Sequence, residues 1–277
     1  MSWYEALIFG IVQGLSEFLP ISSTAHIVIT QMVFGYTFPG LSFEIFLHIG
    51  SILAVLLYFR KDVVEVVTGF FTFLTTRSSH HRTSFFFAIY ILVATFLTGF
   101  LGLLLNDFVS DIMKTPPFIA GALATTGLFL ILIERFHKYG SRTEKDMTFL
   151  DSIFVGLGQT LAVLPGISRS GATLITALYC GLNRDTAVRY SFLLSIPVIL
   201  GSSVLAFDDI GGGAFASIGT GNLIIAFIAS FIFSWIGIVW LIGFLKKSKL
   251  IYFAIYCFVL AVFVVTQLDP TVVIDVE

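Results

Sequence analysis

The chain has 277 residues, a mean hydropathy of +0.99, 57% hydrophobic residues and 12% charged ones. A water-soluble domain carries about twice that charged fraction, so lipid is the expected solvent. The net charge of −2 and the lack of a basic stripe in the sequence exclude a nucleic-acid partner. The two cysteines, Cys180 and Cys257, have neither metal-ligand nor disulfide spacing and are interpreted as small apolar side chains.

In chain order, the first expected element is an interrupted segment. Residues 3–38 are apolar overall but broken by Pro, Gly, Ser and charge, which predicts two half-length helices joined by a loop at membrane depth. A spanning helix, which needs about 20 apolar residues, is expected next over 41–59. The short apolar stretch 63–76 is expected at the membrane interface or partly inserted. Further spans are predicted over 85–105 and 117–133.

The second half of the chain follows the same plan. Residues 149–182 are interrupted in the same way as the first segment, and spans are expected over 186–207, 223–245 and 250–268. The sequence therefore predicts an all-α integral membrane protein that forms a single membrane domain. It is expected to have about six transmembrane helices and two re-entrant broken-helix segments.

Basic residues in short loops predict the orientation of the spans. The loops expected in the cytoplasm lie within 60–61, 77–82, 135–145, 184–189 and 246–249. Acidic residues mark the opposite ends of the spans: Asp107, Asp111, Asp208, Asp209, Asp269, Asp275 and Glu277. This arrangement predicts that both termini lie outside the cytoplasm.

The two halves also resemble each other in sequence. Sliding the chain by 146 positions superposes Gly10 on Gly156, Gln13 on Gln159, Leu15 on Leu161, Ile21 on Ile167 and Ser22 on Ser168. Each half is expected to contain one broken segment and three spans, and because three is odd the halves must be inverted relative to each other. The predicted repeats cover about 1–140 and 146–277. Their polar site is expected near the membrane midplane, where the two broken segments meet.

The first polar cluster surrounds the break in the first segment and comprises Gln13, Glu17, Ser22, Ser23, Thr24 and His26. Gln13 and Glu17 are four residues apart and share one helical face. Pro20 should end that helix, because it lacks an N–H and clashes with the preceding turn. Three hydroxyls then stand at the start of the next helix, with His26 on its first turn. A carboxylate, hydroxyls and an imidazole at a helix N-terminus indicate a phosphate-handling site.

The second polar cluster lies within residues 164–173 and includes Gly166, Ser168, Arg169, Ser170 and Gly171. Pro165 and Gly166 break the helix, and the free N–H groups at the start of the next helix attract anions. Arg169 adds a planar fork that suits two phosphate oxygens. An arginine at this depth costs about 2.5–3.5 kcal/mol on insertion scales, so an anionic partner is the favoured explanation.

Structural explanations stay open beside the functional one. The Pro, Gly, Ser and Thr residues could be ordinary kinks and caps, and Glu17 with Arg169 could be an ion pair across the repeat interface. His26 alone is more often a hydrogen-bonded packing residue than a catalyst. Glu44 and His48, four residues apart at the head of a predicted span, either line the cavity or pair at the surface. Two clusters at matching positions favour a functional site.

These segments resemble the undecaprenyl-diphosphate phosphatase family, also called bacitracin-resistance proteins. The resemblance rests on the pair Gln13 and Glu17 and on residues 18–26 and 165–173, and it extends over essentially the whole chain. Two positions depart from the pattern, because many members have Glu in place of Gln13 and Gly in place of Ala25. An amide donates less charge than a carboxylate, so a metal would rest chiefly on Glu17 and on the phosphates of the substrate.

The resemblance implies a membrane phosphatase that converts undecaprenyl diphosphate to undecaprenyl phosphate and inorganic phosphate, with Mg²⁺ or Ca²⁺ as cofactor. This reaction recycles the lipid carrier of cell-wall precursors at the outer face of the cytoplasmic membrane. It also confers resistance to bacitracin, which sequesters the diphosphate. The expected partners are the lipid substrate and the bilayer, and a homodimer is considered on general grounds.

The expected roles follow the two clusters. Glu17, with Gln13, holds the cation through oxygen ligands. Ser23 is the preferred nucleophile and His26 its base or the proton donor to the leaving group, while attack by water activated by His26 or Glu17 stays open. Arg169 neutralises charge on the transferred phosphoryl group. The expected substrate-binding residues are Ser22, Thr24, Gln159, Gly166, Ser168, Ser170 and Gly171.

Transport is the competing class of function. Inverted repeats with broken helices also build secondary transporters, and a flippase for prenyl phosphates would need the same anion site. Such a protein would need access from both sides of the membrane and no hydrolytic residues. The cluster of Ser23, His26 and Glu17 favours the enzyme, and a prenyl-phosphate lipid flippase stays the alternative.

Overall fold

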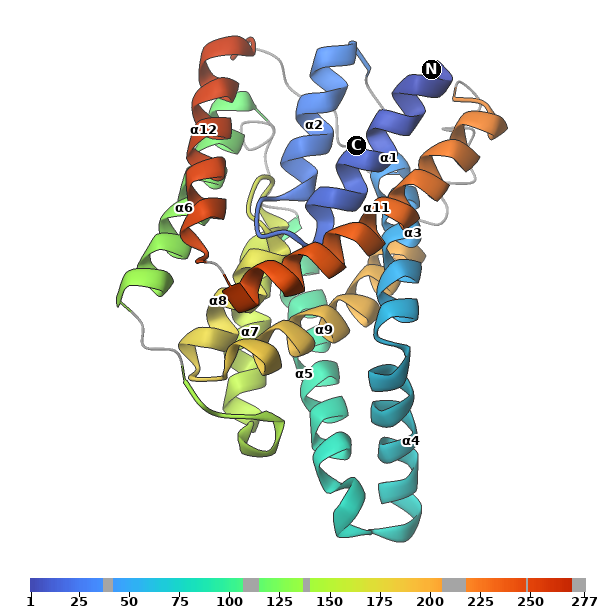
Figure 1. Ribbon diagram of the computed structural model, residues 1–277, viewed down its shortest axis with the longest axis vertical. Helices are drawn as coiled ribbons and strands as arrows, with labels where there is room; N and C mark the ends of the chain where they lie inside the picture. Colours follow the sequence, from blue (N-terminus) through green and yellow to red (C-terminus); the bar gives the residue numbers. More distant parts are fainter. Residues whose placement is uncertain (37–41, 107–114, 137–139, 206–217, 248, 271–277) are drawn as a thin grey trace.

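The computed structural model describes residues 1–36, 42–106, 115–136, 140–205, 218–247 and 249–270. These residues form helices joined by short turns, with no β-strand in the ranges given. The prediction of an all-α protein is confirmed. Figure 1 shows an elongated bundle in which α4 (Arg60–Thr76) and α5 (Arg82–Asn106) form a hairpin that extends at one end.

Within the described ranges, four helices are long and apolar enough to cross a membrane. They are α5, α6 (Pro116–Phe136), α9 (Arg184–Leu205) and α11 (Thr220–Lys247). A fifth candidate is α3 (Ser42–Tyr58) continued by α4, although these two helices are bent by 78° at their junction. Several apolar helices of this length make the chain a multi-pass membrane protein.

The predicted count of about six spans is not confirmed, and α12 (Ile251–Gln267) accounts for part of the difference. This helix fills almost all of the span predicted over 250–268, but it has 17 residues. At 1.5 Å per residue it rises only about 25 Å, less than the roughly 30 Å of a hydrocarbon core. It packs along α6, against which it buries Cys257.

Each of the two interrupted segments folds as two short helices, as predicted. The first consists of α1 (Trp3–Phe18) and α2 (Ser23–Phe34). The second consists of α7 (Phe149–Thr160), the 3-10 turn η4 (Leu161–Val163) and α8 (Arg169–Tyr179). The four α-helices have 16, 12, 12 and 11 residues, so each is too short to span a bilayer.

Helix caps recur at matching positions in the two segments. The pairs lie 146 positions apart and are Ser2 with Thr148, Ser22 with Ser168, and Gly35 with Gly181. Ser2 and Thr148 precede α1 and α7, and Ser22 and Ser168 precede α2 and α8. Gly35 and Gly181 come after α2 and α8, and both have a positive φ. These caps extend the sequence match to local backbone geometry. The inverted relation of the two halves stays a prediction.

Small residues bring α1 against α11 at close range. A Cβ atom at Gly14 would lie 2.6 Å from the Ser230 carbonyl oxygen and 2.7 Å from the Ser234 nitrogen, so only glycine permits this approach. The Ser234 hydroxyl donates to Ser51 of α3 at 2.9 Å, and Ser51 lies 3.1 Å from the Ser230 hydroxyl. This contact fixes the rotation of α1 about its axis, and therefore the direction in which Gln13, the residue before Gly14, points.

Arg142 ties the two ends of the second segment together. Its guanidinium donates to the Asp151 carboxylate of α7 at 2.6 and 3.0 Å and to the Cys180 carbonyl, which follows α8, at 2.6 Å. The backbone N–H and hydroxyl of Thr143, which donate to Asp146, hold the pKa of that carboxyl below its usual range. These contacts set α7 and α8 side by side and so place the loop between them.

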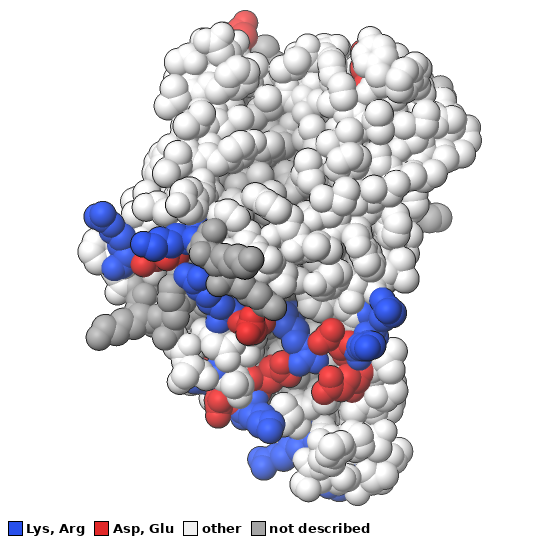
Figure 2. Space-filling view, in the orientation of Figure 1, with Lys and Arg blue, Asp and Glu red and all other residues white. Residues whose placement is uncertain are grey.

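Charged side chains gather toward one end of the molecule. Figure 2 shows them as a band across the lower half of the view, whereas the start of α1 and the end of α12 lie at the upper end in Figure 1. This distribution agrees with the prediction that the basic loops share one side of the membrane. Six of the acidic residues predicted at the other side lie outside the described residues: Asp107, Asp111, Asp208, Asp209, Asp275 and Glu277.

Candidate active site

The two breaks of the chain meet inside the bundle. Arg169, the first residue of α8, forms an ion pair with Glu17 near the end of α1. The Ser170 hydroxyl donates to the Leu19 carbonyl oxygen at 2.9 Å. A Cβ atom at Gly171 would lie 3.3 Å from Pro20, so the start of α8 packs directly on the first break. The structure thus brings together residues that the sequence predicted to share one site.

Glu17 is the centre of the site. Its carboxylate accepts hydrogen bonds from Gln13 Nε2 at 2.8 Å and from the Ser23 hydroxyl at 2.7 Å. His48 Nε2 lies 2.9 Å from the same oxygen, Oε2, and the Arg169 guanidinium binds the other oxygen. The Glu17 side chain is 1% exposed, and a carboxylate so deeply buried needs this many donors to stay charged. The contact with Ser23 also places a proton acceptor beside the expected nucleophile.

Glu44 and His48 belong to the same polar cluster. Glu44 accepts a hydrogen bond from the Thr24 hydroxyl at 2.6 Å and lies 3.9 Å from His48 Nε2. The side chains of Glu44 and His48 are 5% and 15% exposed, so the interpretation that they pair at the surface is wrong. Their spacing of four residues showed that they share a helical face, but it did not show that this face meets Glu17.

His26 makes its contacts on the side of α2 that faces α12. Nδ1 lies 2.6 Å from the Ser22 carbonyl oxygen, which can only accept, so Nδ1 carries the hydrogen. Nε2 lies 2.6 Å from the hydroxyl of Tyr256, and the two rings are parallel within 4° with centroids 5.6 Å apart. Both ring nitrogens of His26 thus contact groups other than the Ser23 hydroxyl, which donates to Glu17. The imidazole that contacts this carboxylate is His48. Tyr256 was not predicted, because a tyrosine in an apolar helix carries no signal of its own.

The two loops have unusual backbone geometry at their turning points. Ser22 has a φ of 69°, which is uncommon for a residue other than glycine and is costly to maintain. It is buried, and its hydroxyl accepts from the Ala25 N–H at 3.4 Å as the cap of α2. In the second loop the positive φ, 93°, falls on Gly166, where a Cβ would lie 2.8 Å from Ala122. Both predicted residues therefore shape the site through the backbone.

The serines of the second loop form local hydrogen bonds that stabilise it. The Ser168 hydroxyl accepts from the Gly171 N–H at 3.0 Å and caps α8. It lies 3.2 Å from the Ser170 hydroxyl, and the Ser168 N–H donates to Thr126 of α6 at 3.3 Å. These bonds hold the start of α8, and with it Arg169, against the first break.

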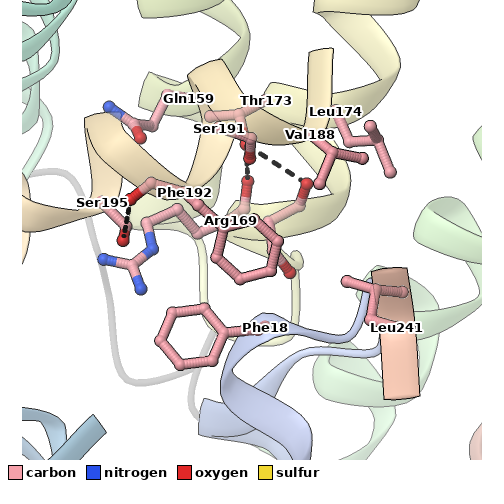
Figure 3. A pocket seen from close by; sticks show the side chains of 11 residues that line it. Phe18, Gln159, Arg169, Thr173, Leu174, Val188, Ser191, Phe192, Ser195 and Leu241 are labelled. Atoms are coloured by element: carbon pink, nitrogen blue, oxygen red, sulfur yellow. Dashed lines mark hydrogen bonds between the residues drawn. The ribbon is translucent and has the colours of Figure 1, made fainter. Parts of the chain in front are cut away.

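A small cavity of about 20 Å³ adjoins the Arg169 side chain, enough for about one water molecule. Figure 3 shows the Arg169 guanidinium between Ser195 of α9 and Phe18 in the view, with Thr173 of α8 and Ser191 of α9 further along the wall. Thr173 and Ser191 share a hydrogen bond there. Gln159, a predicted substrate-binding residue, lines the same cavity and donates to Thr98 of α5 at 2.8 Å.

A hard divalent cation prefers oxygen ligands, and the oxygens considered for it are those of Glu17 and of the Gln13 amide. Within the part of the chain that the structure describes, the Gln13 Oε1 atom is buried without a hydrogen-bond partner, while the Gln13 amide nitrogen contacts Glu17. Glu44 offers a second buried carboxylate near His48. Among the residues that the structure describes, no three His, Cys, Asp or Glu side chains converge as a metal site. A cation here would therefore draw on the Gln13 amide and on phosphate oxygens besides Glu17.

Comparison with known proteins shows the family of the chain. The family model described as bacitracin resistance protein BacA matches residues 6–263, a span that contains both breaks. The chain belongs to this family. The family that the two loop motifs predicted is thereby confirmed.

Relatives in the BacA family match the chain over nearly its full length. It is 67% identical over 278 residues, covering 100% of both chains, to a protein of Halalkalibacterium halodurans named undecaprenyl-diphosphatase 2. It is 57% identical to undecaprenyl-diphosphatase 1 of Shouchella clausii, over 95% of this chain and 96% of that one. It is 38% identical to undecaprenyl-diphosphatase 3 of Bacillus anthracis, over 92% of this chain and 94% of that one.

Proposed function

We propose that this protein is a membrane phosphatase that hydrolyses undecaprenyl diphosphate to undecaprenyl phosphate and inorganic phosphate. The relatives that are 67% and 57% identical over almost the whole chain carry the name of this enzyme. In the structure, the observation that carries the proposal is the buried Glu17 carboxylate between the Ser23 hydroxyl and the Arg169 guanidinium. This reaction regenerates the lipid carrier and gives resistance to bacitracin.

Arg169 binds the diphosphate. Its guanidinium presents a planar set of donors that matches two phosphate oxygens, and the N–H groups at the start of α8 add partial positive charge. When an anion enters, Arg169 exchanges part of its contact with Glu17 for the phosphate. The positive charge then opposes the negative charge that builds on the transferred phosphoryl group.

Ser23 is the nucleophile. Its oxygen forms a bond to the terminal phosphorus while the bond from that phosphorus to the bridging oxygen breaks, and undecaprenyl phosphate leaves. The hydroxyl proton passes to Glu17 Oε2, which lies 2.7 Å from the Ser23 oxygen. The oxygen of a water molecule then bonds to the phosphorus of the phosphoserine while the bond from that phosphorus to the Ser23 oxygen breaks. The Ser23 oxygen takes its proton back from Glu17 Oε2, and inorganic phosphate leaves with the oxygen and protons of the water. His26, bound to Tyr256, stands one turn further along α2, and its role as proton donor to the leaving group is part of the proposal.

The cofactor is a divalent cation, Mg²⁺ or Ca²⁺, held by Glu17 and Gln13. When bound, it would neutralise phosphate charge beside the reacting phosphorus. Gln13 supports this role, because its amide nitrogen contacts the carboxylate and its amide oxygen is buried with no hydrogen-bond partner among the described residues.

The membrane arrangement is proposed from the charge pattern. It has about six spans and two re-entrant segments, in inverted repeats of about 1–140 and 146–277, within the cytoplasmic membrane. Both termini and the opening of the site face outward. The band of charged residues at one end and the start of α1 at the other support this orientation. A homodimer is compatible with it.

Release of inorganic phosphate from undecaprenyl diphosphate by the purified protein in detergent tests the proposal. Wild type is expected to release phosphate with Mg²⁺ or Ca²⁺ and to lose activity with a chelator. The relatives described above are named as diphosphatases, which favours the enzyme over a flippase for prenyl phosphates. Wild-type protein that binds the lipid but releases no phosphate with either metal would favour the flippase.

A further inference from the structure

His48 is a second imidazole at the centre of the site. It lies on α3, and its Nε2 atom is 2.9 Å from Glu17 Oε2, the oxygen that also accepts from Ser23. The His48 side chain is 15% exposed, so its polar atoms have little water to bind and depend on these partners. His48 therefore contacts the acceptor of the reactive hydroxyl and not the hydroxyl itself.

The other donors to Glu17 cannot hold it in place throughout the reaction. Gln13 lies on α1 one turn before Glu17, so it moves with the same helix. Ser23 is phosphorylated in the proposed mechanism, so it cannot donate to Glu17 during that step. Arg169 is drawn toward the phosphate when the substrate binds. His48 comes from a separate helix and can stay in contact with Glu17 at every step.

His48 is itself part of a closed ring of polar contacts. The ring links α1 to α2 through Glu17 and Ser23 at 2.7 Å, and α3 to α1 through His48 and Glu17 at 2.9 Å. The third side links α2 to α3 through Thr24, the neighbour of Ser23, and Glu44 at 2.6 Å. Glu44 lies 3.9 Å from His48, one turn away on α3. Three helices are thus fixed relative to one another at the site of attack.

We propose that His48 is a positioning residue that holds the Glu17 carboxylate toward the Ser23 hydroxyl, with Thr24 and Glu44 completing the ring. This inference rests on the proposed function. A preorganised acceptor lowers the barrier because the carboxylate need not reorient at the moment of proton transfer. The role requires a hydrogen-bond donor at the position of Nε2, and a side-chain amide can supply one in place of an imidazole.

The test compares His48→Leu with His48→Gln in purified protein, with His80→Leu at an exposed turn as the matched control. His48→Leu is expected to lower kcat by about 10–100-fold with KM nearly unchanged, since loss of a supporting contact typically costs that much activity. His48→Gln should recover most of the loss, and the control should match wild type. Melting temperatures in detergent show whether each variant is folded.

Several results would overturn the inference. One is a kcat of His48→Leu equal to that of wild type, and another is a loss in His48→Gln as large as in His48→Leu. A third is an effect of His48→Leu on KM alone, or only on the cation concentration that gives half of the full activity. If wild type itself releases no phosphate, the proposed function fails, and a second readout judges the ring. In ¹⁵N-histidine-labelled protein the Nε2 resonance of His48 must shift in Glu17→Ala; an unchanged resonance refutes the contact.

Discussion

Arg169 and Glu17 form a part-buried ion pair across 152 positions of sequence, and through it the two broken segments meet. Taking the Glu17 charge out of water is costly, and the cost is offset only where further donors surround the carboxylate. Gln13, Ser23 and His48 supply those donors. The pair is thus stable without substrate and still offers a guanidinium that a phosphate can engage.

The first prediction concerns the planar fork of Arg169. Arg169→Ala should lower kcat by about 10²–10³-fold, the usual effect of removing a donor that stabilises transition-state charge. Arg169→Lys keeps the charge but loses the paired donors, so its kcat should lie between that of wild type and that of Arg169→Ala. Phosphate release at saturating substrate measures both variants. Full activity in Arg169→Lys would show that charge alone suffices.

The second prediction concerns the metal. Gln13→Glu places a second carboxylate beside Glu17, and because cation affinity rises with ligand charge, the concentration of Mg²⁺ or Ca²⁺ that gives half activity should fall about tenfold. Gln13→Leu removes the amide oxygen and should raise the cation concentration that gives half activity. Titrating activity against each cation provides the measurement. If both variants need the same cation concentration as wild type, Gln13 is not a ligand.

The third prediction concerns the packing that holds α1. Gly14→Val should destabilise the protein strongly, because its Cβ would lie 2.6 Å from the Ser230 carbonyl oxygen and α11 would have to move. Gly121→Ala is the control, since among the described residues no atom beyond its own stretch of helix lies within 4 Å of the added Cβ, and it should be neutral or more stable by up to about 1 kcal/mol. Thermal melting in detergent compares them. Equal melting temperatures would show that α1 and α11 are not in close contact.

The fourth prediction concerns Tyr256. Tyr256→Phe keeps the ring stacked on His26 but removes the hydroxyl that lies 2.6 Å from Nε2. A lost hydrogen bond of about 0.5–1.5 kcal/mol should lower kcat by roughly 2–10-fold if His26 takes part in the reaction. His26→Ala should lower it further. Unchanged kcat in both variants would reduce His26 to a packing residue.

Much of this arrangement could be predicted from the sequence, because the signals are local. Pro20 and the pair Pro165–Gly166 end helices by steric clash and by a positive φ, so both breaks were placed correctly. The anion site is predicted from an arginine that lipid alone would not tolerate, and it stays a prediction. The interpretation of Glu17 and Arg169 as an ion pair across the two segments is also confirmed, and it does not conflict with a functional role.

Other features depend on packing that no local pattern records. The spacing of Glu44 and His48 indicated a shared face but not that this face meets Glu17. The contact of His26 with Tyr256 joins α2 to α12, and an aromatic in an apolar helix gives no hint of it. The number of spans depends on helices whose length is close to the minimum needed to cross the bilayer, such as α12 with its 17 residues. Substrate, metal and roles of the site residues stay predictions.

The most direct test of the central claim, that the two breaks form one active site, is a double-mutant cycle on phosphate release. Glu17→Ala, Arg169→Ala and the double variant are compared with wild type as purified, folded proteins and undecaprenyl diphosphate as substrate. Each single variant should lose at least about 100-fold in kcat, and the double variant should lose little more than the worse single one, because the two residues act as a unit. Losses that multiply, or near-normal turnover in either single variant, would contradict the account.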